Sequence, residues 1–144
     1  MRKLIIAIFI AVSLSSGRVD AGEDDMSAEI RQPAVAGAFY PGDPAELAKM
    51  IAGMMAKTPR PDIPGDIVAL IAPHAGYIYS GPVASYAYKA IQGHEYKDVI
   101  VISPCHVEAF AGAAIYPGAA YRTPLGDVPI DKELSENQQQ FHGY

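Results

Sequence analysis

Apolar residues along the chain form two kinds of pattern. An apolar stripe at helical spacing runs through residues 47–54 and predicts an amphipathic helix. This helix should begin at Asp43 and Pro44, because aspartate can cap a helix and proline suits its first position. By contrast, residues 66–72 and 97–103 are continuous apolar runs of strand length. Runs without alternation are typical of strands buried on both faces of a parallel sheet.

The segment between these two runs predicts a crossover helix. Residues 82–91 read as a helix, with Ser80 or Gly81 near its cap. Strand, helix and strand in this order make a βαβ unit, whose two strands run in the same direction. Residues 113–116 predict a third, edge strand. The fold class is therefore α/β, with a parallel or mixed sheet and flanking helices.

Each apolar run ends in a proline followed by a histidine. Pro73-His74 ends the first run, and Pro104-Cys105-His106 ends the second. Ligands of open α/β sheets bind at the carboxyl edge, so we expect His74 and His106 to converge there. Two imidazoles can bind zinc, iron or copper, and Cys105 and Asp127 are candidates for a third ligand. The alternative is that both are loop histidines with local hydrogen bonds.

Further candidates lie close to these motifs. Tyr77 and Tyr79 follow His74 and could be phenolic acid/base groups or walls of a pocket, and we take Tyr77 as the catalytic candidate. Cys105 could also act as a nucleophile, which would need a partner base. Arg122 and Asp127 could pair with each other, or Arg122 could hold an anion. Tyr79, Cys105, Arg122 and Asp127 together form the candidate pocket.

The net charge and the amino-terminal segment indicate which partners and which cellular location to expect. A formal net charge of −5 over 144 residues argues against nucleic acid as a partner, because nucleic-acid binding needs clustered Lys and Arg. Residues 1–21 combine a positive start, a short apolar run and a small-residue cleavage pattern, which predicts a signal peptide and an exported protein. We then expect no membrane span after cleavage. If the segment is not cleaved, the protein is cytoplasmic. Residues 22–30 read as a flexible lead-in.

Four segments together carry a family resemblance. They are PAVAGAFYP at 33–41, APHAGY at 72–77, SPCH at 103–106 and YRTPLGD at 121–127. In order and spacing they resemble the Memo family (mediator of cell motility), known in bacteria as the AmmeMemoRadiSam system protein B. Residues 31–144 would be the N-terminal portion of a Memo-like domain, apparently truncated, because the family's remaining site residues lie in a second half.

The resemblance implies a fold similar to class III extradiol dioxygenases, the LigB-like group. It also implies that His74 and His106 are the first two ligands of a non-haem copper or iron ion with redox activity, up to a catechol-opening dioxygenase. The residues leave two alternatives open: a non-enzymatic module that binds a small molecule or peptide, and a fragment without independent function. A partial sheet could also self-associate through its exposed edge.

Overall fold

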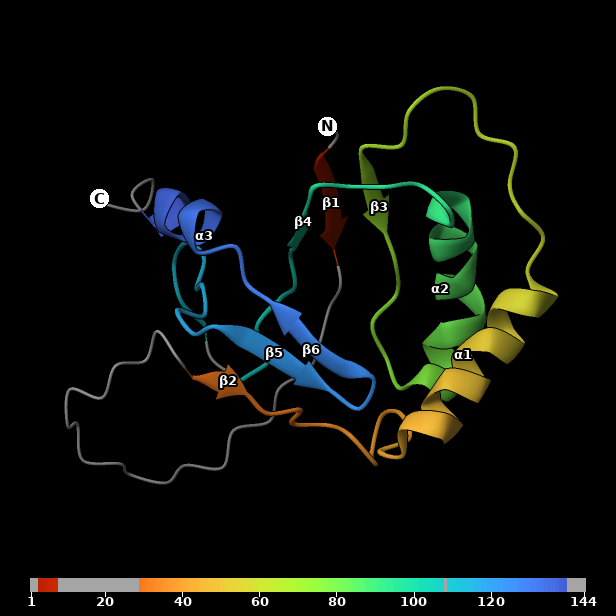
Figure 1. The fold of residues 1–144 in the computed structure, drawn as a ribbon, viewed down its shortest axis with the longest axis horizontal. Coiled ribbons are helices and arrows are strands. Elements are labelled where there is room, and N and C mark those ends of the chain that lie inside the picture. Colours follow the sequence, from red (N-terminus) through yellow and green to blue (C-terminus); the bar gives the residue numbers. More distant parts are fainter. Residues whose placement is uncertain (1–2, 8–28, 108, 140–144) are drawn as a thin grey trace.

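The computed structural model describes residues 3–7, 29–107 and 109–139, which form two three-stranded sheets and three helices (Figure 1). The first sheet is parallel, with the order β3-β1-β4, and consists of β1 (Lys3–Ala7), β3 (Ala69–Ile71) and β4 (Asp98–Val101). The second is mixed, with the order β2-β5-β6, and consists of β2 (Ile30–Arg31), β5 (Ala120–Thr123) and β6 (Gly126–Pro129). The helices are α1 (Pro44–Lys57), α2 (Tyr77–Ile91) and α3 (Lys132–Gln139). The predicted α/β class is confirmed.

The start of α1 follows the local sequence rules. Asp43 lies at the N-cap, where its carboxylate accepts a hydrogen bond of 2.9 Å from the backbone N–H of Glu46. Pro44 occupies the first helical position, where its missing N–H costs nothing. The predicted helix and its starting residue are confirmed. The start could be predicted because capping depends on contacts within a single turn.

The start of α2 was predicted too late in the chain. The helix begins at Tyr77, is preceded by Gly76 as N-cap, and contains Pro82 in its interior. An interior proline removes one helical hydrogen bond, which is why the local rule places proline at a helix start. In α2 the residues that precede Pro82 are held by a contact outside the helix, since the N–H of Tyr77 donates to the carbonyl of Phe39 over 2.8 Å. This tertiary contact lets the helix begin before the proline.

The middle strand of the parallel sheet comes from the segment predicted as a signal peptide. Residues of β1 pair with β3 on one side and with β4 on the other, so β3 and β4 are parallel but are not neighbours. The predicted common direction of the two strands is confirmed, and β1 lies between them. Export stays a prediction, and both the proposed cleavage site and residues 22–28 lie outside the described residues. Among the described residues, no helix is long and apolar enough to cross a membrane.

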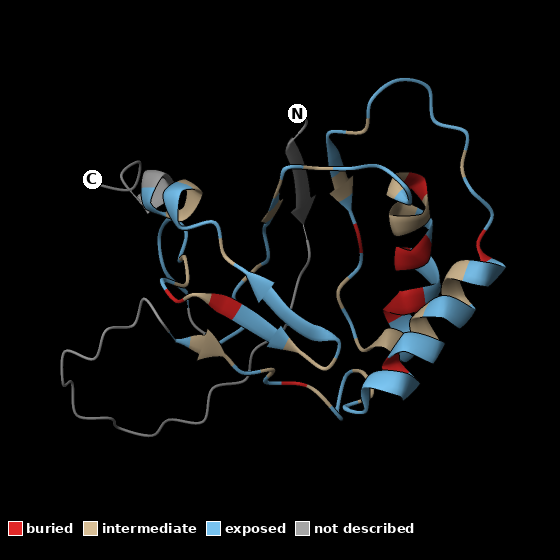
Figure 2. Cartoon of the chain, viewed as in Figure 1, coloured by how far each residue is buried: buried red, intermediate tan, exposed pale blue. Residues whose placement is uncertain are grey.

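Burial of the parallel sheet differs from the prediction. In β3 and β4 burial alternates along the strand, and the side chain of Ile71 is 88 % exposed (Figure 2). The expectation that both faces are covered is therefore wrong, because α1 and α2 pack mainly on each other and make at most marginal contact with the sheet. Buried apolar residues in the described part of the chain are few and mostly small: Val35, Leu47, Ala72, Ala84, Ala90 and Ala120.

The downstream region forms a hairpin where we predicted an edge strand and a loop. Residues 113–116 are not a strand, whereas β5 and β6 pair antiparallel across a tight turn at Pro124 and Leu125. Gly126 has a φ of +125°, a value that favours glycine, and it lets the chain reverse after two residues. We predicted a loop over residues 121–127, but this segment contains most of β5, the turn and the start of β6.

Candidate functional site

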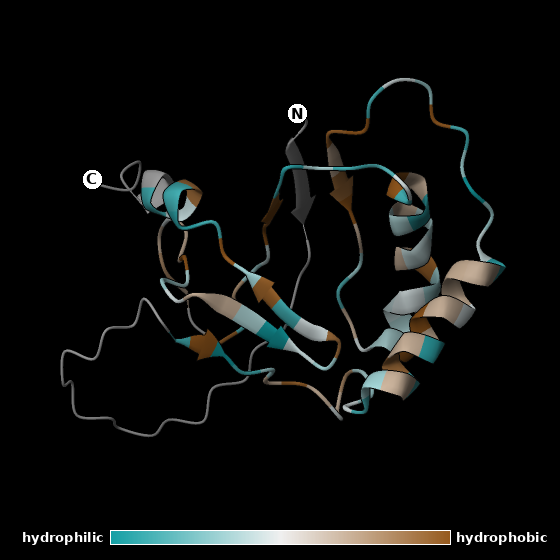
Figure 3. Cartoon of the chain, viewed as in Figure 1, coloured by the Kyte–Doolittle hydropathy of each residue, from teal (hydrophilic) through white to brown (hydrophobic). Residues whose placement is uncertain are grey.

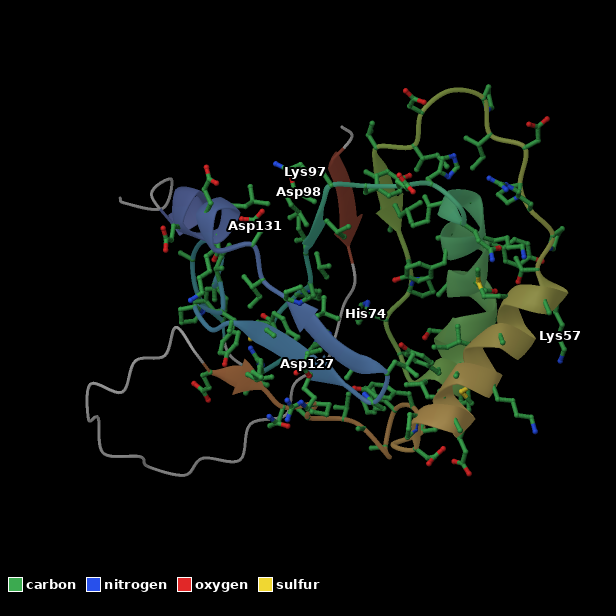
Figure 4. All side chains as sticks on the ribbon, in the orientation of Figure 1. Lys57, His74, Lys97, Asp98, Asp127 and Asp131 are labelled. Carbon is green, nitrogen blue, oxygen red and sulfur yellow. The ribbon has the colours of Figure 1, made fainter. Side chains whose placement is uncertain are left out.

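The two candidate histidines follow strands that end at the same edge of the parallel sheet. His74 comes after β3, which ends at Ile71, and His106 comes after β4, which ends at Val101. Because both strands run parallel to β1, their carboxyl ends face the same way. Figure 4 shows His74 on the connection between β3 and α2.

The structure brings the two imidazole rings together. Their Nε2 atoms lie 3.2 Å apart, and the rings are stacked with centroids 5.3 Å apart and an interplanar angle of 22°. His74 is half-buried and His106 is exposed. The predicted convergence of these residues is confirmed. At this distance the two nitrogens lie within hydrogen-bonding range, and which of them donates depends on the tautomer.

The loop that carries His74 is held in place by the segment 35–40. This segment makes a tight turn, in which Gly37 has a φ of +80° and the carbonyl of Val35 accepts hydrogen bonds from Ala38 and Phe39. The turn lies against the start of α2, where Phe39 accepts from the N–H of Tyr77. A Cβ at Gly76 would lie 3.5 Å from the same Phe39 carbonyl, an ordinary van der Waals distance, so the turn packs closely against this glycine.

A second contact stabilises the same loop from within α2. The hydroxyl of Ser80 donates to the carbonyl of Ala75 over 2.8 Å and closes the turn that follows His74. Sequence reasoning considered Ser80 only as a helix cap and gave the turn around Gly37 no role in the site. The signal was present in PAVAGAFYP, a motif rich in small residues in which Phe39 and Tyr40 precede the final Pro41.

Tyr77 belongs to a cluster of tyrosines under this loop. Its ring lies 5.2 Å from that of Tyr40, with a tilt of 46°. Burial raises the pKa of Tyr77 above its ordinary value, and the neighbouring Tyr40 adds to the rise. Burial together with Tyr77 raises the pKa of Tyr88 to about 12. The Tyr77 phenol is consequently protonated at neutral pH and can donate a proton or a hydrogen bond, but it is not a base there.

The candidates for a third metal ligand do not complete a metal site. In the part of the chain that the structure describes, no group of three or more His, Cys, Asp and Glu side chains could hold a metal ion. Among the described residues, neither Cys105 nor Asp127 joins the two histidines in such a group, and the identity of a third ligand stays a prediction. Cys105 is exposed. Tyr79 is also exposed and forms no enclosed wall beside the histidines.

Arg122 and Asp127 form an ion pair across the β5–β6 hairpin. Arg122 Nε donates to Asp127 Oδ1 over 2.8 Å, and Nη2 donates to Oδ2 over 2.9 Å. This hydrogen-bonded contact with Arg122 lowers the pKa of Asp127, and the same contact raises the pKa of Arg122. Of the two roles that the sequence left open, the structure supports mutual pairing.

Comparison with known proteins identifies the family. The model of the Memo-like protein family matches residues 31–144. A MEMO1 family protein of Aquifex aeolicus is 42 % identical over 107 residues, which is 74 % of this chain and 39 % of that protein. A MEMO1 family protein of Thermoplasma acidophilum is 39 % identical over 106 residues, again 74 % of this chain and 39 % of the relative.

The match is confined to one part of these relatives. The chain spans about two fifths of the length of the curated relatives that it matches. No solved structure gives a significant match. Because the family model covers well over half of the chain, and relatives at about 40 % identity agree with it, the chain is a member of the Memo-like protein family.

Proposed function

We propose that this protein binds a redox-active metal ion, copper or iron, through His74 and His106. The observation that carries the proposal is the Nε2–Nε2 distance of 3.2 Å. For metal–nitrogen bonds of about 2.0–2.1 Å, two ligands at a right angle lie about 2.9 Å apart, and two at a tetrahedral angle about 3.4 Å apart. The observed separation lies between these two values, so the spacing of the two nitrogens suits the binding of one ion by both imidazoles.

The chemistry of the ligands supports the choice of metal. Imidazole suits copper, iron and zinc, and copper(II) binds most tightly among these divalent ions at a given site. An exported protein would also meet copper more readily than ferrous iron. A bound copper or iron ion would supply one-electron redox chemistry. The chain itself would hold the ion through two nitrogens, with the protonated phenol of Tyr77 as the candidate donor three residues after His74.

We further propose a LigB-like domain, with the ion at the carboxyl edge of the parallel sheet. A dioxygenase site of the common type needs two histidines and one carboxylate. The described residues provide the two histidines and no carboxylate within a common cluster. Metal binding is therefore the function that these residues support, and ring-opening catalysis would need a further ligand.

Copper(II) titration of the full chain tests the proposal, with affinity measured by competition against a chelating dye. Replacing either histidine, in His74→Ala or His106→Ala, should weaken binding by a factor of about 100 or more, since each loses one of two bonds to the metal. His94→Ala is the matched control, because His94 is an exposed histidine in a different loop. Equal affinities in all four proteins would overturn the proposal.

A further inference from the structure

A cavity of about 220 Å³ lies between the end of α2 and residues 58–68, which join α1 to β3 and which we call the connector. The connector arches over the end of α2 (Figure 1). Arg60 and Asp62 of the connector line the cavity, together with Ala90 of α2 and His94 from the turn that follows it. The lining includes neither of the two paired histidines, so the cavity is separate from the proposed metal site.

Contacts at both ends hold the connector against α2. At its start, the hydroxyl groups of Thr58 and Ser85 are hydrogen-bonded over 2.7 Å. Near its end, the hydroxyl of Tyr96 donates to the carbonyl of Ile67 over 3.4 Å. Three prolines lie between these two points, and each fixes a backbone φ angle. The cavity is therefore formed before any ligand binds, which lowers the cost of binding.

The cavity is lined by two opposite charges that do not neutralise each other. Within the part of the chain that the structure describes, neither Arg60 nor Asp62 forms an ion pair or a side-chain hydrogen bond. Arg122 and Asp127, by contrast, satisfy each other fully. A guanidinium group binds a carboxylate in a bidentate manner, and a carboxylate accepts hydrogen bonds from an ammonium group. Two such side chains in one cavity suit a ligand that carries both charges.

The size and polarity of the cavity limit the ligand further. Its volume is below the range of about 300–1,000 Å³ that is usual for pockets of drug-sized ligands. Polar atoms form most of its surface, and the imidazole of His94 adds a group that can donate or accept a hydrogen bond. The connector alternates between hydrophilic and hydrophobic stretches (Figure 3). These features favour a small hydrophilic molecule.

We propose that this cavity binds a small polar α-amino acid in its zwitterionic form. Arg60 binds the carboxylate, Asp62 binds the ammonium group, and His94 contacts the polar side chain of the ligand. Pro61 separates the two charged residues, and its fixed φ angle holds them in one relative arrangement. The site is additional to the proposed metal site and does not depend on it.

An NMR titration of the ¹⁵N-labelled full chain tests the proposal, with L-serine as the probe and a chelator present to remove metal. L-serine should shift the amide resonances of the connector and of Ala90. Arg60→Gln and Asp62→Asn should each weaken binding by a factor of about ten or more, because each removes charge-assisted hydrogen bonds. Lys49→Gln is the matched control, since Lys49 is an exposed cation on α1 outside the lining, and it should leave the affinity within a factor of about two.

Two analogues of L-serine separate recognition from damage to the fold. 3-Hydroxypropanoate lacks the ammonium group, and ethanolamine lacks the carboxylate. Arg60→Gln should weaken binding of 3-hydroxypropanoate and leave that of ethanolamine unchanged, whereas Asp62→Asn should do the reverse. Absence of L-serine binding to the native chain would overturn the proposal, and so would equal losses for both analogues in each variant.

A further variant keeps this result distinct from that of the metal proposal. The His74→Ala/His106→Ala protein should bind L-serine as the native chain does, because neither histidine lines the cavity. Loss of L-serine binding in this variant would contradict the separation of the two sites.

Discussion

The pair His74–His106 and the pair Arg122–Asp127 differ in how the polar groups of their two side chains meet. Arg122 and Asp127 satisfy each other, with two charge-assisted hydrogen bonds of 2.8 and 2.9 Å. The two histidines instead bring together two groups of the same kind, with their Nε2 atoms 3.2 Å apart. Two imidazole nitrogens at this spacing can share a hydrogen bond or can both bind one metal ion.

Comparing the two pairs indicates which kind of candidate residue pair suits a ligand-binding site. Both pairs were candidates, and both lie in segments that resemble Memo motifs. An ion pair that is complete within the chain has no remaining demand for a ligand. Two imidazole nitrogens brought together from two strand ends can both bind one cation instead of each other. The predictions below test this contrast in order of expected effect.

The largest expected effect is an increase in the stability of the protein when metal binds to the histidine pair. At a free copper(II) concentration of 100 times the dissociation constant, the unfolding free energy should rise by about 2.7 kcal/mol. Thermal unfolding with and without copper measures this as a rise in melting temperature. His106→Ala should lose the rise, whereas Arg122→Ala should retain it. An equal rise in both variants would remove the distinction between the two pairs.

The ion pair should show a smaller effect that depends on pH. Because Arg122 lowers the pKa of Asp127 in the folded state, the pair stabilises the protein above the unfolded pKa, and this stabilisation is lost as pH falls through the lowered folded value. The melting temperature of Asp127→Asn should therefore be slightly below that of the native chain at neutral pH and should converge with it in acid. The difference should be small, because both side chains are largely exposed.

A carboxyl-carbon NMR titration checks the same point directly. Asp127 should titrate below the ordinary aspartate range, and Arg122→Ala should return it toward that range. Because the proposed metal site is the histidine pair, adding copper should not move this titration. An unshifted Asp127 in the native chain would contradict the pairing.

Local sequence rules predicted the features that depend on few residues. Asp43 and Pro44 mark the start of α1, because capping involves one turn of backbone. The meeting of His74 and His106 was also predictable, because it needs only two parallel strands that end at one edge. The intervening β1 does not disturb that geometry, since all three strands run in the same direction.

Three of the failures involve contacts between distant segments. Pro82 suggested a helix start, but the contact between Tyr77 and Phe39 fixes an earlier one. The apolar run in residues 4–14 fits a signal peptide, and part of it equally fits a central strand, because both need uninterrupted apolar residues. Likewise, a continuous apolar strand such as 66–72 reads the same whether its faces are covered by its own chain or by another segment.

The central claim is that His74 and His106 bind the same metal ion. Pulsed electron paramagnetic resonance of the full chain, loaded with one equivalent of copper(II), counts the imidazole nitrogens bound to the metal. We expect two imidazoles in the native chain and in His94→Ala, one in either His74→Ala or His106→Ala, and none in the double variant. A single imidazole in the native chain, or a spectrum unchanged in the double variant, would contradict the account.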